Sequence, residues 1–101
     1  MNFQFDETAT GVSVRITGDL DFAANGEFKK IIDRLVTVKG KPVTFDLAGV
    51  GRIDSVGLGL LYIAKEEASP PGGKIHLKSV QKGVLKMLEL TEADTDFDIQ
   101  G

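Results

Sequence analysis

The sequence has 101 residues, of which 42% are hydrophobic, and this predicts a single domain over residues 1–101 with one hydrophobic core. Its 12 basic and 15 acidic residues give a net charge of −3. Because nucleic-acid-binding proteins usually carry a basic excess, we expect no nucleic-acid partner. The absence of cysteine excludes disulfides and thiolate zinc sites.

No segment of the sequence predicts export or membrane insertion. Residues 1–11, MNFQFDETATG, lack both the basic and the apolar segment of a signal peptide. The longest apolar run, residues 58–64, is interrupted by Gly59 and is too short to span a bilayer. We therefore expect a cytoplasmic protein with no direct membrane insertion.

The first 42 residues predict a β-hairpin followed by a helix. Apolar and polar residues alternate in residues 3–5 and again in 11–17, as in half-buried strands, and TATG between them can form the turn. Residues 25–38 change to a helical period, with these apolar side chains three and four residues apart: Phe28, Ile31, Ile32 and Leu35. Gly40 and Pro42 end this helix.

The middle of the chain predicts a strand followed by a second helix. Residues 42–50 form a short, mostly apolar run that is typical of a strand. Residues 57–68 carry apolar side chains on all sides of a helix, so much of its surface is expected to be buried. The sequence PPGG at 70–73 ends this helix.

The last third repeats the alternation. Residues 74–79 predict a strand with Ile75 and Leu77 facing inward and His76 facing outward. Residues 80–90 predict a third helix with Ser79 as its N-cap. The tail adds a short strand or packs its apolar side chains against the core. The order β-β-α-β-α-β-α, with a final strand, predicts a mixed sheet with helices packed on it.

The constellations of residues that enzymes need are missing. His76 is the only histidine and stands in the middle of a strand, without the partners that catalysis or metal binding requires. GVGRID at 49–54 has Asp54 where a dinucleotide fingerprint needs its third glycine. Ser55 lacks the preceding glycine of a hydrolase nucleophile turn. We therefore expect no enzyme, no catalytic residue, no cofactor and no metal ion.

Asp54 and Ser55 lie where a strand and loop change into a helix. The first amides of a helix have no partner within the helix, and Ser55 is a residue type that accepts from them as an N-cap. The same position attracts anions, so a phosphate on Ser55 would be held by these amides while Asp54 repelled it. Gly57 and Gly59 lower helix stability, which indicates close approach of another backbone or of a partner.

Three segments of the sequence occur together in one known family. GDLD at 18–21 precedes a helix, FDLAGVGRIDSVGLGLL at 45–61 joins a strand to an Asp-Ser-x-Gly-Leu-Gly turn, and GGKIHLKSVQKGVLKMLELT at 72–91 joins a strand to a helix. In this order they resemble the STAS domain family, whose founding members are bacterial anti-sigma-factor antagonists. The resemblance covers almost the whole chain. It implies an α/β fold in which the helices pack largely on one side of a mixed sheet.

The resemblance also implies a protein-binding switch. In the family's antagonists, the unphosphorylated form captures a kinase-type anti-sigma factor and so frees a sigma factor. The kinase phosphorylates the loop, and a serine phosphatase restores the antagonist. The expected contact surface is the loop 49–57 with the first turn of the second helix, together with residues 18–25. Its candidate partner-binding residues are Asp21, Asn25, Asp54, Ser55, Val56, Gly57 and Leu58. In the plain structural interpretation, Asp21 or Asn25 caps the first helix. One residue can serve both as this cap and as a contact for the partner.

The sequence departs from the family pattern at Val56, where the best-known antagonists carry the phosphorylated hydroxyl residue. Three hypotheses follow: Ser55 is an alternative acceptor, the domain binds its partner constitutively with Ser55 as a cap, or the loop contacts a ligand or nucleotide. STAS domains also serve as subunits of transporters, where they stabilise a cytoplasmic ATPase without a phosphorylation switch. The loss of the hydroxyl at Val56 favours this alternative function.

Overall fold

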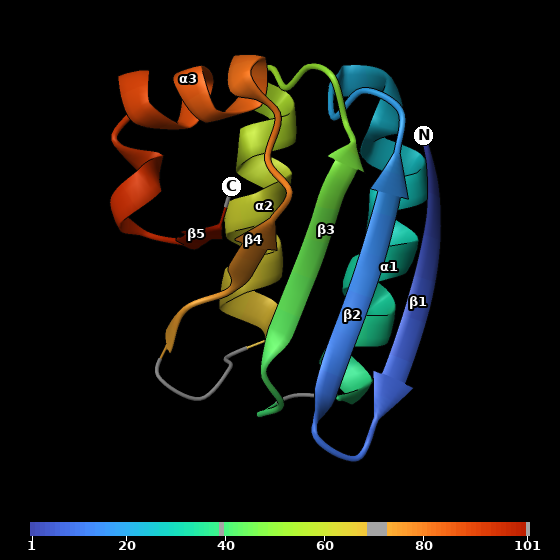
Figure 1. Ribbon diagram of the computed structural model, residues 1–101. Helices are drawn as coiled ribbons and strands as arrows, with labels where there is room; N and C mark the ends of the chain where they lie inside the picture. Colours follow the sequence, from blue (N-terminus) through green and yellow to red (C-terminus); the bar gives the residue numbers. More distant parts are fainter. Residues whose placement is uncertain (39, 69–72, 101) are drawn as a thin grey trace.

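The computed structural model describes residues 1–38, 40–68 and 73–100 (Figure 1). The secondary structure of these residues follows the predicted alternation and includes the final strand. In chain order the elements are β1 (Asn2–Thr8), β2 (Gly11–Thr17), the 3-10 helix η1 (Phe22–Ala24), α1 (Asn25–Thr37), β3 (Val43–Gly49), α2 (Ser55–Ala68), β4 (His76–Lys78), α3 (Lys82–Leu90), the 3-10 helix η3 (Ala93–Thr95) and β5 (Asp98–Gln100).

The strands form one mixed sheet in the order β1-β2-β3-β4-β5. β1 and β2 are the predicted antiparallel hairpin, in which Phe3 lies opposite Ile16 and Phe5 opposite Val14. The other neighbouring strands are parallel. Parallel neighbours need a crossover connection, and α1, α2 and α3 lie within these connections.

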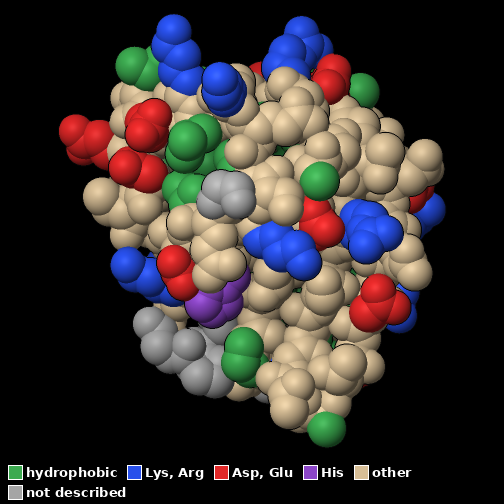
Figure 2. Space-filling model, viewed as in Figure 1, with side chains coloured by type: hydrophobic (Ala, Val, Ile, Leu, Met, Phe, Trp, Pro, Cys, Tyr) green, Lys and Arg blue, Asp and Glu red, His purple; other side chains and the backbone are tan. Residues whose placement is uncertain are grey.

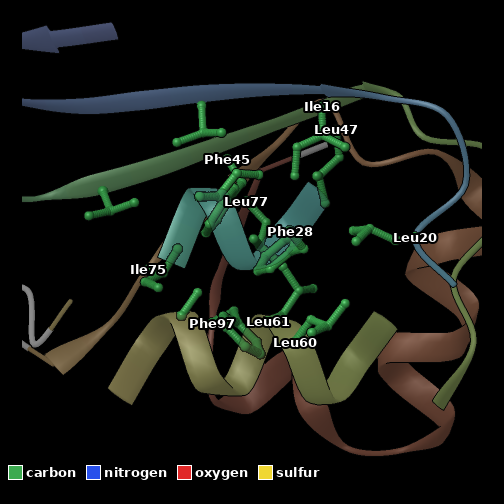
Figure 3. Close-up of a cluster of buried hydrophobic side chains, with 14 of the residues drawn as sticks. Ile16, Leu20, Phe28, Phe45, Leu47, Leu60, Leu61, Ile75, Leu77 and Phe97 are labelled. Carbon is green, nitrogen blue, oxygen red and sulfur yellow. The ribbon is translucent and has the colours of Figure 1, made fainter. Parts of the chain in front are cut away.

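The hydrophobic core lies between the sheet and the two longer helices. α1 and α2 contact each other and cover the same face of the sheet, whereas α3 lies beyond one end of the sheet (Figure 1). Side chains from the strands and from both helices meet in this layer (Figure 3). Its labelled members are all buried: Ile16, Leu20, Phe28, Phe45, Leu47, Leu60, Leu61, Ile75, Leu77 and Phe97. The predicted α/β fold, with helices largely on one side of the sheet, is confirmed.

No helix of the described residues covers the opposite face of the sheet (Figure 1). Charged side chains of both signs are interspersed over it, and few hydrophobic side chains are visible (Figure 2). Arg15 Nε lies 3.6 Å from Asp46 Oδ2, between β2 and β3. His76 Nδ1 lies 2.6 Å from Asp98 Oδ2, between β4 and β5. His76 thus has the outward position that the sequence predicts, paired with a carboxylate.

Two helix starts differ from the prediction. α2 begins at Ser55 rather than at residue 57. α3 begins at Lys82 and its N-cap position is held by Gln81, so the prediction that Ser79 caps α3 is wrong. Ser79 has a φ of +57°, in the left-handed region, because the chain turns sharply between β4 and α3. Of the predicted break at residues 70–73, residues 70–72 lie outside the described residues. None of the described helices is long and apolar enough to cross a membrane.

Candidate functional site

Three loops meet at one edge of the sheet, because β2, β3 and β4 are parallel and their carboxyl ends share that edge (Figure 1, top). These loops contain residues 18–21, 50–54 and 79–81. In open α/β sheets, ligands bind outside the carboxyl ends of the strands. The Asp54-Ser55 junction and the GDLD segment, which are separated by over thirty residues in the sequence, therefore share one surface.

Backbone hydrogen bonds hold the first two loops together. Leu20 and Ile53 form an isolated parallel bridge beyond the ends of β2 and β3. In this bridge the Leu20 N–H donates to the Arg52 carbonyl (2.9 Å), and the Asp54 N–H donates to the Leu20 carbonyl (3.1 Å). The bridge fixes η1, which follows residue 21, against the first turn of α2.

Asp54, not Ser55, caps α2. Asp54 Oδ1 accepts a hydrogen bond from the Gly57 N–H (2.8 Å), and the Asp54 carbonyl accepts one from the Leu58 N–H (2.9 Å). Both bonds are those of an N-cap residue. The predicted cap role of Ser55 is wrong because the preceding aspartate already satisfies the free amide, which leaves Ser55 as the first helical residue. Asp54 Oδ2 also accepts from the Phe22 N–H (3.3 Å), so one carboxylate joins η1 to α2.

These contacts change the ionisation of Asp54. The hydrogen bond from the Gly57 N–H is the largest cause that lowers the pKa of the Asp54 carboxyl below its ordinary value of 3.8. Desolvation opposes this effect, and the N–H groups of Phe22 and Val56 and the Arg52 guanidinium add to it. Hydrogen bonds to a carboxylate favour its charged form. Asp54 is therefore a fixed negative charge at the N-terminus of α2, where the helix dipole stabilises it.

Ser55 and Val56 are exposed on the first turn of α2. Among the described residues the Ser55 hydroxyl makes no hydrogen bond, so it is open to solvent. The side chain of Val56 is apolar and 37% exposed. The structure thus brings a free hydroxyl, an exposed apolar group and a carboxylate together on consecutive residues.

The two glycines of the turn have different surroundings. A Cβ on Gly57 would lie 2.0 Å from the Leu20 carbonyl oxygen, so Gly57 lets the GDLD loop approach α2. A Cβ on Gly59 would meet nothing within 4 Å. Of the predicted contact residues, Gly57 is buried and Leu58 is partly buried against the core, so both position the turn from inside.

Asp21 and Asn25 do not cap α1, which corrects the plain structural interpretation. The N-cap position of α1 is held by Ala24, Asn25 is the first helical residue, and no side-chain hydrogen bond caps either η1 or α1. Asp21 instead turns toward the neighbouring loop, where its Oδ2 lies 3.4 Å from the Arg52 guanidinium. The same guanidinium lies 3.6 Å from Asp19 Oδ2.

The expected contact surface, residues 18–25 and 49–57, includes Phe22 and Arg52 without naming them as candidate binding residues, and Gln81 lies outside both ranges. Phe22 is 73% exposed, and its position out of phase with the apolar face of the following helix was a usable signal. Gln81 Nε2 donates to the Ala48 carbonyl (2.7 Å), a contact that no local pattern predicts because it joins residues from two separate loops. Within the part of the chain that the structure describes, no group of three or more His, Asp or Glu side chains could hold a metal ion.

Comparison with known proteins identifies the family. The model of the STAS domain matches residues 2–100 of the chain. The chain belongs to the STAS domain family. A STAS-domain containing protein of Pseudomonas aeruginosa (strain UCBPP-PA14) is 26% identical over 88 residues, which are 87% of this chain and 86% of that protein. The resemblance inferred from the sequence motifs is thus confirmed.

Solved structures similar to this STAS domain include anti-sigma factor antagonists. A candidate anti-sigma factor antagonist from Thermotoga maritima is 26% identical, with a TM-score of 0.84 over 98% of this chain and 86% of that chain. The anti-sigma factor antagonist SpoIIAA, in its unphosphorylated form, is 20% identical, with a TM-score of 0.64 over 88% of this chain and 83% of that chain. The likeness to SpoIIAA concerns the fold.

Proposed function

We propose that this STAS domain is a regulatory protein-binding module of the anti-sigma-factor antagonist type and not an enzyme. It binds a kinase-type anti-sigma factor, in the cytoplasm, through the turn from Asp54 to Gly59. The observation that carries the proposal is the exposed Ser55 hydroxyl beside the ionised Asp54 carboxylate, at the edge of the sheet where three loops meet. The similarity to a candidate antagonist at 26% identity supports the same class of partner.

The geometry favours Ser55 as the regulated residue. A phosphate on Ser55 would lie at the N-terminus of α2, where helix amides and the helix dipole favour anions. It would add a charge of about −1.5 to −2 next to the Asp54 carboxylate. Because the Ser55 side chain makes no hydrogen bond among the described residues, this charge would change the surface without breaking a contact of the fold. A serine phosphatase that removes the phosphate would restore the surface.

Val56 supports a second candidate function. It fills the usual acceptor position with a side chain that cannot be phosphorylated. A STAS subunit that stabilises the cytoplasmic ATPase of a transporter needs no acceptor, so the same surface would then bind its partner permanently. The two candidates differ in the class of partner and in the modification of Ser55.

An affinity capture from the native cell extract distinguishes the two candidates. The tagged protein is the bait, and mass spectrometry identifies the captured proteins and measures phosphate on Ser55 in the bound and unbound fractions. We expect a kinase-type anti-sigma factor in the bound fraction and phosphate on Ser55 in the unbound fraction only. Capture of a transport ATPase with unmodified Ser55 in both fractions would contradict the antagonist function.

Two variants with the same chemical change provide the matched test. Ser55→Asp places a carboxylate at the proposed site, whereas Ser13→Asp places one at an exposed serine of β2, away from the loops. Ser55→Asp is expected to unfold close to the wild-type temperature because its side chain is exposed, whereas Ser13→Asp lies opposite Asp6 in β1 and should unfold at a slightly lower temperature, so capture is compared well below both. Ser55→Asp should lose capture of the anti-sigma factor and Ser13→Asp should retain it. Equal capture by both would show that the partner does not respond to charge at Ser55.

A further inference from the structure

Phe22 combines an ordered backbone with a side chain in solvent. Its N–H donates to Asp54 Oδ2 (3.3 Å), and the turn that contains it is closed by a hydrogen bond from the Ala24 N–H to the Asp21 carbonyl (3.0 Å). Yet 73% of the residue is exposed. The fold therefore holds an aromatic ring in a defined position without burying it.

Val56 lies beside the same carboxylate. Its N–H lies near the Asp54 carboxylate, whose Oδ2 accepts a hydrogen bond from the Phe22 N–H. Along α2, Val56, Gly59 and Ile63 are spaced three and four residues apart and so share one face of the helix. The side chains of Val56 and Ile63 are 37% and 45% exposed, and the space above Gly59 is open.

Packing within the domain explains neither Phe22 nor Gly59. A glycine in a helix interior destabilises the helix by about 1 kcal/mol relative to alanine, and at Gly59 no neighbouring backbone requires it. An exposed aromatic side chain contributes little to the core. Both features are explained if another protein approaches this face closely, since aromatic residues are enriched among those that dominate binding energy.

The charges beside Phe22 indicate the chemistry of that protein. Segments 19–22 and 52–55 together carry three carboxylates, of Asp19, Asp21 and Asp54, and one guanidinium, of Arg52. Arg52 is already paired with two of the three, so the segments keep two negative charges in excess. A complementary surface is apolar at its centre and basic at its rim. An arginine or lysine at that rim could also stack on the Phe22 ring.

We propose that Phe22 is the anchor residue with which this STAS domain docks on its anti-sigma factor. Phe22 inserts into an apolar pocket flanked by arginine or lysine side chains, and Val56, Gly59 and Ile63 line the wall of the contact. This inference rests on the proposed antagonist function, because that function supplies the partner. It assigns the specificity of binding to a residue outside the Asp54–Gly59 turn.

Site-specific photocrosslinking in the native host tests this inference. The variant Phe22→p-benzoylphenylalanine places an aromatic crosslinker at the proposed anchor. Leu90→p-benzoylphenylalanine is the matched control, because Leu90 is also 73% exposed but lies at the end of α3. We expect a covalent adduct with the kinase-type anti-sigma factor from position 22 and none from position 90.

Binding of the purified factor completes the test. Phe22→Ala should weaken its affinity at least about tenfold, and Leu90→Ala should leave it within about twofold, while both variants unfold close to the wild-type temperature. If the factor is captured but crosslinks equally at both positions, or binds Phe22→Ala as tightly as wild type, this inference is wrong and the antagonist function stands. An adduct between two copies of this chain would likewise overturn the inference. If position 22 crosslinks a transport ATPase and no anti-sigma factor is captured, both proposals are wrong.

Discussion

Substitution of Gly57 by alanine tests the contact that joins the GDLD loop to α2. The new Cβ would lie 2.0 Å from the Leu20 carbonyl oxygen, 2.6 Å from its carbon and 3.1 Å from Ile53 Cγ1. Carbon and oxygen atoms in contact are normally about 3.3–3.6 Å apart. The backbone of Leu20 must therefore move away from the new Cβ by more than ~1 Å. That movement strains or breaks the hydrogen bond from the Asp54 N–H to the Leu20 carbonyl.

The expected magnitude follows from three effects. Overpacking costs typically about 1–3 kcal/mol, and a lost backbone hydrogen bond costs about 0.5–1.5 kcal/mol. Alanine in place of glycine returns up to about 1 kcal/mol of helix stability. We therefore expect Gly57→Ala to lower the free energy of unfolding by about 1–3 kcal/mol. In a domain of this size, the melting temperature would fall by about 5–20 °C.

Gly59→Ala is the matched control on the same helix. No atom lies within 4 Å of its new Cβ, so only the gain in helix propensity remains. We expect this variant to be more stable than wild type by up to about 1 kcal/mol. Thermal unfolding followed by circular dichroism measures both variants. If Gly57→Ala melts at or above the wild-type temperature, the Leu20 carbonyl does not pack against Gly57, and the inferred link between the loops is wrong.

The remaining predictions concern the core and two ionisable groups. Leu61→Ala should lower the free energy of unfolding by about 2–5 kcal/mol because Leu61 is fully buried. Ile63 is exposed, so Ile63→Ala should change this free energy by no more than about 0.5 kcal/mol. If chemical denaturation gives similar losses for the two variants, Leu61 does not lie in the core. The lowered pKa of Asp54 contributes stability that is present above about pH 4 and lost as the pH falls through the folded-state pKa. The melting temperatures of wild type and Asp54→Asn should therefore converge on acidification, and a constant difference would contradict this role of the charge. The hydrogen bond to Asp96 Oδ2 (2.6 Å) raises the pKa of Tyr62 to about 12, and its stabilisation is present below about pH 10 and lost as the pH rises through the folded-state value. Because Tyr62 is the only tyrosine, absorbance titration should report it directly and should show a lower midpoint for Asp96→Asn; an unchanged midpoint would exclude the bond as the cause.

The sequence by itself determined the elements of this protein and the faces that they bury. Alternation in β2 placed Val12, Val14 and Ile16 in the core, and the helical spacing of Phe28, Ile31 and Leu35 placed the buried face of α1. These features were readable because strand and helix periods act over a few neighbouring residues. The motifs GDLD and DSVGLG, together with the order of the elements, were also sufficient to indicate the STAS family, which the match over residues 2–100 confirms.

Only the tertiary structure decided how the site is assembled. The parallel pairing of β2, β3 and β4 brings three distant loops to one edge, and the bridge between Leu20 and Ile53 sets their distance. Asp54 rather than Ser55 caps α2, because the closely packed loop directs the second oxygen of its carboxylate to the Phe22 N–H. Local propensity accepts either residue as a cap. Contacts between segments distant in the sequence decide which residue caps the helix and which side chains stay exposed to a partner. Strand and helix periods carry no information about these contacts.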